Sequence, residues 1–168
     1  MTFLSFYGII RYTKKGRQYI MANTKAIYFD MDGTIANLYA VEGWLPMIRA
    51  YDPTPYATAE PMVRMEALAQ LLNRLQHKGY TIGIVSWLSK DPNPVFGEVV
   101  AKAKREWLAK YLPTVEWDEV HIVAYGKCKA KVVKYGDGIL FDDEERNRNE
   151  WTGTAYGVDN ILEILKRL

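Results

Sequence analysis

The sequence predicts an α/β fold, namely a Rossmann-like parallel sheet of about five strands with helices on both faces. Short apolar segments rich in β-formers alternate along the chain with longer segments whose apolar residues have helical spacing. Such alternation is typical of parallel strands joined by helical crossovers. Two of the apolar segments also end in aspartates, "IYFDMDGT" at 27–34 and "ILFDD" at 139–143. Charged groups placed directly after buried strands indicate a site at one edge of the sheet.

Five segments have the length and composition of buried strands. The first and fourth are the most apolar, and the fourth is preceded by Gly136 and Gly138. The predicted strands are residues 25–30, 80–86, 119–125, 139–143 and 154–158.

Amphipathic helices are expected between and after these strands. The first is predicted to start at Pro61 and to end before Gly79, because proline favours a first helical turn and glycine follows a last one. Further helices are predicted at 95–111, near 129–135 and at 160–168. Residues 35–60 have no regular period and contain Pro46, Pro53 and Pro55, so this segment is predicted to be a small loop insert.

The bulk composition is that of one ordinary globular domain. The chain has 168 residues, a net charge of +2 and one cysteine, Cys128, which cannot form an internal disulfide. A lone cysteine fits a reducing cytoplasm, so a cytoplasmic location is expected. No apolar run approaches the roughly 20 residues of a membrane span. Residues 1–20 differ from the rest and Met21 precedes the first strand, so we hypothesise that 1–20 are translated leader and that 21–168 form the domain.

Polar side chains follow four of the predicted strands. They are Asp30 and Asp32 after the first, Ser86 at the end of the second, Lys127, Lys129 and Lys131 after the third, and Asp142 and Asp143 at the fourth. The carboxyl ends of parallel strands meet at one edge of a sheet, where ligands bind. Clustered carboxylates raise each other's pKa, and a hard divalent cation relieves their repulsion. The sequence therefore predicts a Mg²⁺ site that also takes phosphate oxygens.

These motifs, in this order, resemble those of the haloacid dehalogenase superfamily of phosphohydrolases. The matching segments are "DMDGT" at 30–34, "IVS" at 84–86, a lysine within 127–131 and "ILFDD" at 139–143. The resemblance spans about residues 25–160 and implies a haloacid-dehalogenase-like fold. Neither 35–60 nor 87–126 is long enough for a large cap domain, so a minimal cap or none is expected.

The resemblance implies a catalytic role for each matching residue. Asp30 would be the nucleophile that forms an aspartyl-phosphate, and Asp32 the acid and then the base. Ser86 would donate a hydrogen bond to a phosphoryl oxygen. Among the three lysines we favour Lys129 as the cation that offsets negative charge, because it would lie in the first turn of the helix before the fourth strand; Lys131 and then Lys127 are the alternatives.

The same resemblance implies how Mg²⁺ would be held. Its ligands would be the Asp30 carboxylate, the backbone carbonyl of Asp32 and the pair Asp142 and Asp143. We favour Asp143 as the direct ligand of that pair, with Asp142 behind it. No other cofactor is expected, since the sequence contains no G-x-x-x-x-G-K-[ST] and no G-x-G-x-x-G motif.

Aromatic residues indicate the substrate class. The segments "FDMDGTIANLY" and "FDDEERN" look most like the 5'-nucleotidase and deoxyribonucleotidase branch, including phage-encoded relatives, although Thr34 is general to the superfamily. This resemblance implies a nucleoside monophosphate as the substrate, with another small phosphomonoester as the alternative. The rings either stack on a nucleobase or pack as a mini-core under the insert. They are Tyr39, Trp44, Tyr51, Tyr56 and Trp87.

Two other functions remain open at this stage. A polynucleotide end phosphatase would suit a site without a cap, although nucleic acid is the less favoured partner. A phospho-receiver signalling module also combines acidic residues, a hydroxyl, a lysine and Mg²⁺ on a parallel sheet. Receivers lack an aspartate at the position of Asp32, which favours the phosphatase.

Overall fold

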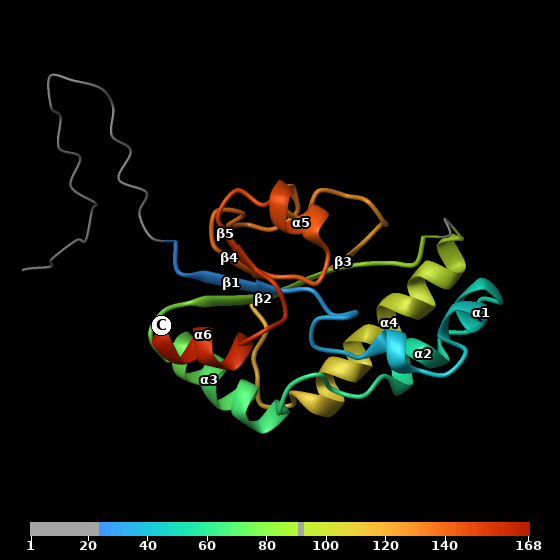
Figure 1. Ribbon diagram of the computed structural model, residues 1–168, viewed down its shortest axis with the longest axis horizontal. Coiled ribbons are helices and arrows are strands. Elements are labelled where there is room, and N and C mark those ends of the chain that lie inside the picture. Colours follow the sequence, from blue (N-terminus) through green and yellow to red (C-terminus); the bar gives the residue numbers. More distant parts are fainter. Residues whose placement is uncertain (1–23, 91–92) are drawn as a thin grey trace, which may run out of the picture.

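A parallel sheet of five strands forms the centre of the structure, a computed structural model that describes residues 24–90 and 93–168 (Figure 1). The strands are β1 (Ala26–Phe29), β2 (Thr81–Trp87), β3 (Glu119–Val123), β4 (Ile139–Phe141) and β5 (Thr154–Tyr156). Their spatial order is β3-β2-β1-β4-β5, and every neighbouring pair is parallel. The five predicted strands and the α/β class are confirmed. The hypothesis about residues 1–20 lies outside the described residues.

Helices cover both faces of the sheet. They are η1 (Leu38–Ala40), α1 (Trp44–Arg49), α2 (Thr54–Thr58), α3 (Met65–His77), α4 (Pro94–Tyr111), η2 (Lys129–Lys131), α5 (Glu145–Glu150) and α6 (Ile161–Arg167). Helices α3, α4 and α6 share one hydrophobic core with the sheet, while α5 and the segment around η2 lie over the opposite face (Figure 1). No helix in the described part of the chain is long and apolar enough to cross a membrane.

The alternation of β1 side chains builds both cores. Ile27 and Phe29 face the larger one, where they meet the fully buried Leu68 and Leu72 of α3. Tyr28 faces the smaller core on the other side of the sheet. The central strand is therefore buried on both faces, as its apolar sequence predicts.

Helix α3 begins at Met65, four residues later than predicted from Pro61. The intervening backbone pairs with the chain that follows β1: the Met62 N–H donates to the Ile35 carbonyl, and the Asn37 N–H donates to the Glu60 carbonyl. These hydrogen bonds satisfy the backbone in an extended form, so the helix does not start there. Helix α5 was not predicted, because its sequence "ERNRNE" carries no apolar periodicity.

The segment 35–60, predicted to be a loop, contains η1, α1 and α2, and we call it the insert. Its prolines did not exclude helix because Pro46 and Pro55 occupy first-turn positions, where no backbone N–H is needed. Ile48 and Tyr56 of the insert are buried against Phe96 and Val100 of α4. The insert is thus a small structured cap rather than an irregular connection.

Candidate active site

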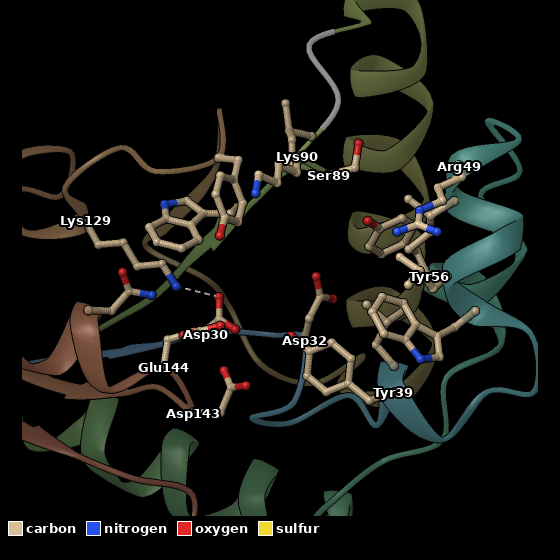
Figure 2. A pocket seen from close by; sticks show the side chains of 18 residues that line it. Asp30, Asp32, Tyr39, Arg49, Tyr56, Ser89, Lys90, Lys129, Asp143 and Glu144 are labelled. Atoms are coloured by element: carbon tan, nitrogen blue, oxygen red, sulfur yellow. Dashed lines mark hydrogen bonds and ion pairs between the residues drawn. The ribbon is translucent and has the colours of Figure 1, made fainter.

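Asp30 follows β1 at the centre of the sheet edge and is 5% exposed. Its backbone N–H donates to the carbonyl of Phe141, which carries the β1–β4 pairing one residue past the strand. The Lys129 ammonium lies 2.6 Å from Asp30 Oδ1 (Figure 2). It also lies 2.6 Å from Asp142 Oδ2. Lys127 and Lys131 are exposed. Of the three lysines considered, the structure brings Lys129 to the carboxylates.

Asp142 and Asp143 differ in how they are held. Asp142 is fully buried and accepts hydrogen bonds from Lys129, from the Glu144 backbone N–H at 3.0 Å and from Asn147 Nδ2 at 3.1 Å on each oxygen. The Asp143 carboxylate is partly exposed, and Thr34 Oγ1 lies 3.5 Å from its Oδ1. Asp142 is therefore occupied by protein donors, whereas Asp143 retains capacity for another ligand.

The carboxylates of Asp30, Asp142 and Asp143 fit a divalent cation. One oxygen from each lies within 4.8 Å of the others. Burial, reinforced by the charge of Asp30, raises the pKa of Asp142 to about 6 and that of Asp143 to about 7. Burial is the larger cause of both shifts, and the negative charge of the neighbouring carboxylates adds to it. Three convergent oxygens in such a field match the preference of Mg²⁺ for carboxylate ligands.

Asp32 points away from that cluster and pairs with another lysine, Lys104 of α4. The Lys104 ammonium is 2.7 Å from Asp32 Oδ2, 2.9 Å from Ser86 Oγ and 2.7 Å from the Trp87 carbonyl oxygen. Burial raises the pKa of Asp32, and Asp30 adds to this, while Lys104 opposes it. A raised pKa suits a carboxyl group that must carry a proton before it donates one.

Ser86 is fully buried and takes part in this lysine network. Its hydroxyl oxygen accepts from Lys104, so its own proton can be directed elsewhere. Ser86 does not line the cavity described below, whereas Asp30 and Asp32 do. Its predicted hydrogen bond to a phosphoryl oxygen stays a prediction.

Two residues of the site were missed in the sequence. Lys104 falls on the buried stripe of α4, between Val100 and Trp107, and a lysine in an apolar stripe was the signal that could have revealed it. Asn147 is 3% exposed and holds Asp142, but it lies in a short polar helix that offered no signal.

Gly33 makes the close approach of the two acidic motifs possible. Its φ of +75° lies in the left-handed region, and a Cβ there would stand 2.5 Å from Asp143 Oδ2 and 2.6 Å from Tyr39 Cε2. Any side chain at this position would displace the Asp143 carboxylate. The glycine of "DMDGT" is thus needed for space as well as for the turn.

A cavity of about 380 Å³ opens over these groups. Figure 2 shows Asp30, Asp32 and Asp143 between Lys129 on one side and Tyr39, Tyr56 and Arg49 of the insert on the other. Apolar and aromatic residues dominate its wall. The lining residues are Asp30, Asp32, Leu38, Tyr39, Trp44, Leu45, Ile48, Arg49, Tyr56, Trp87, Leu88, Ser89, Lys90, Tyr125, Lys129, Asp143, Glu144 and Asn147.

The structure divides the aromatic residues between the two roles considered for them. Tyr39 and Trp44 form an edge-to-face pair with centroids 5.1 Å apart and line the cavity. Trp87 also lines it. Tyr51 instead packs against Phe96 of α4, at 5.4 Å. Tyr56, part of the mini-core, reaches the cavity as well, so one insert supplies both its own core and a wall of the site.

The sequence matches no protein-family model and no curated protein. Solved structures do share its fold. D,D-heptose 1,7-bisphosphate phosphatase from B. bronchiseptica, complexed with magnesium and phosphate, is 13% identical with a TM-score of 0.50, over 78% of each chain. The phosphatase of the same name from Burkholderia thailandensis is 15% identical with a TM-score of 0.45, over 74% of this chain and 70% of that one. The fold is thus the one found in the B. bronchiseptica phosphatase, as the sequence motifs predicted.

Proposed function

We propose that the protein is a Mg²⁺-dependent phosphomonoester hydrolase that acts through an aspartyl-phosphate. The observation that carries this proposal is the position of Asp30. Its carboxylate belongs to a three-carboxylate cluster, contacts the buried Lys129 and lines a cavity large enough for a small substrate. A nucleophile, a cation and an open space for the phosphoryl group therefore coincide.

The residues account for both halves of the reaction. An Asp30 oxygen attacks phosphorus, and the bond from phosphorus to the leaving oxygen breaks as Asp32 donates its proton to that oxygen. Asp32, now ionised, accepts a proton from water as the water attacks phosphorus. The bond from phosphorus to Asp30 then breaks and inorganic phosphate is released. Throughout, the Lys129 ammonium offsets the charge on Asp30 and on the phosphoryl oxygens.

Mg²⁺ is the cofactor that this donor set fits. Asp30 and Asp143 would hold it directly, with the backbone carbonyl of Asp32 as a further expected ligand, while Lys129 and Asn147 keep Asp142 in place. When bound, the cation would neutralise charge on the carboxylates and on the phosphoryl group. The magnesium and phosphate bound to the B. bronchiseptica phosphatase support the assignment.

The cavity supports a nucleoside monophosphate as substrate. Aromatic side chains from the insert and from the end of β2 form walls on which a flat base can stack. Arg49 and Lys90 are exposed at the same cavity and add positive charge near a polyanionic substrate. The insert supplies Arg49, whereas Trp87 and Lys90 come from the end of β2 and the residues after it.

A phosphate-release panel with Mg²⁺ tests the proposal. It includes nucleoside 5'- and 3'-monophosphates, sugar phosphates and 3'-phosphorylated oligonucleotides, with Asp30→Asn as the inactive control. We expect the highest kcat/KM on a nucleoside monophosphate. Preference for the oligonucleotide would assign a polynucleotide end phosphatase instead. A single stoichiometric phosphorylation without turnover would assign a receiver-like module and contradict the hydrolase.

A further inference from the structure

Lys104 is a lysine buried inside the domain, and all of its hydrogen-bonding capacity is used. Its residue is 1% exposed, and its ammonium donates to Asp32 Oδ2, Ser86 Oγ and the Trp87 carbonyl. Two of these three acceptors belong to consecutive residues at the end of β2. The sheet therefore fixes the ammonium, and the ammonium in turn fixes the Asp32 carboxylate.

We propose that Lys104 is a positioning residue that orients Asp32 for proton transfer at the leaving oxygen, an inference that rests on the proposed phosphatase function. Lys104 distinguishes the two oxygens of Asp32. Oδ2 is held at 2.7 Å, while Oδ1 has no hydrogen-bond partner among the described residues, and Asp32 lines the cavity. The oxygen left free is the one available to carry the transferable proton.

A contact with the insert extends this role. The ring centroid of Tyr56 lies 5.2 Å from the Lys104 ammonium, within the range of a cation–π interaction. Tyr56 also lines the cavity and belongs to the core that joins the insert to α4. One ammonium thus connects the acid–base carboxylate with the wall against which the leaving group would lie.

The leaving group makes this role measurable. 4-Nitrophenolate departs without a proton, whereas the alkoxide of benzyl phosphate needs one. A lysine that only stabilises the fold would slow both esters alike when it is removed. A lysine that positions Asp32 would slow cleavage of benzyl phosphate selectively.

The test compares Lys104→Met with Lys102→Met, an exposed lysine two residues away on the same helix that pairs with Glu106. Rapid-quench single turnovers with Mg²⁺ measure the first phosphoryl transfer on each ester. We expect Lys104→Met to lose about a hundredfold on benzyl phosphate and less than about tenfold on 4-nitrophenyl phosphate, and Lys102→Met to match wild type. Equal losses on both esters would overturn the proposal.

A double variant makes the test independent of the folding of Lys104→Met. Asp32→Asn combined with Lys104→Met removes both charges of the pair, so neither is left buried alone. If Lys104 acts through Asp32, this variant cleaves benzyl phosphate as fast as Asp32→Asn alone, to within about threefold. Independent, additive losses would overturn the proposal. A wild-type protein that cleaves neither these esters nor any member of the phosphate-release panel would contradict the phosphatase function itself, which separates the two failures.

Discussion

Two buried lysines contact the two aspartates of the "DMD" motif, and the groups around the two lysines differ. Lys129 lies between two carboxylates, Asp30 and Asp142. Lys104 contacts one carboxylate, Asp32, together with a hydroxyl and a backbone carbonyl. Each also has an indole or phenol ring near its ammonium, Trp87 at 5.1 Å and Tyr56 at 5.2 Å.

The difference lies in the balance of charge. One ammonium among Asp30, Asp142 and Asp143 leaves the Lys129 side negative, and a cation can be accepted there. Lys104 faces a single carboxyl group, Asp32, rather than an excess of carboxylates, so no further ion is required. The comparison teaches that the same residue type can offset charge on one side of a site and set orientation on the other.

The largest effect is expected from removing the nucleophile on the Lys129 side. Asp30→Asn keeps the shape of the side chain but eliminates attack on phosphorus, so turnover should fall by at least about 10³-fold. Phosphate release from 4-nitrophenyl phosphate measures it, with Glu145→Gln as an exposed carboxylate control. Activity within roughly tenfold of wild type would show that Asp30 is not the nucleophile.

Removing the Lys129 ammonium should slow both ester classes alike. Lys129→Met is expected to lose about a hundredfold or more on aryl and alkyl esters, because the lost charge faces the phosphoryl group rather than the leaving group. Lys127→Met and Lys131→Met, whose side chains are exposed, should stay near wild type. Mild and equal losses of activity in all three variants would show that residues 127–131 form only a basic surface. Lys129 would then have no special role beside the phosphoryl group.

The excess negative charge beside Lys129 should appear as a pH dependence of stability without metal. Burial and the neighbouring carboxylates raise the pKa of Asp143 to about 7, so folded protein holds this proton more tightly than unfolded protein. The contribution of Asp143 to the free energy of unfolding is fully present below pH 3.8, the ordinary pKa of the group. It is lost as the pH rises to about 7.

Melting temperatures in EDTA between about pH 5 and pH 8 test this sign. Wild type should lose stability relative to Asp143→Asn as the pH rises, and Mg²⁺ should restore it. A difference between the two proteins that stays constant across this pH range would contradict the assignment of Asp143 to the crowded cluster.

The smallest effects should come from the rings beside the lysines. A cation–π contact is worth about 0.5–2 kcal/mol, so each loss corresponds to a rate change of about twofold to about thirtyfold. Trp87→Leu should slow aryl and alkyl esters equally, whereas Tyr56→Leu should slow alkyl esters more. Tyr80→Leu, which removes a ring 5.6 Å from the exposed Lys25, is the matched control. If the ratio of the aryl-ester rate to the alkyl-ester rate is the same in all three variants, the two lysines do not have the different roles proposed for them.

The sequence predicted the strands and the residues at their ends because these signals are local. A buried strand that stops at "DMDGT" or "FDD" carries its own evidence, and Asp30 and Asp142 meet once their strands are neighbours. Lys104 was not predicted because a lysine on a helix is ordinarily exposed. Its side-chain partners Ser86 and Asp32 lie 18 and 72 positions away in the sequence. The helices of the insert were not predicted because they are short and their stability depends on packing against α4.

The central position of β1 has a consequence for how the chain acquires its activity. Asp30 contacts Lys129, 99 positions further along the chain, and Thr34 contacts Asp143, 109 positions along. During synthesis, the first aspartate pair emerges long before the residues that complete the charge balance around it. Parallel pairing at such separation is slow compared with helix formation. Recovery of turnover after dilution from denaturant should therefore be slower than recovery of helical circular dichroism. Turnover requires contacts between residues from both halves of the chain, whereas helices form from local contacts.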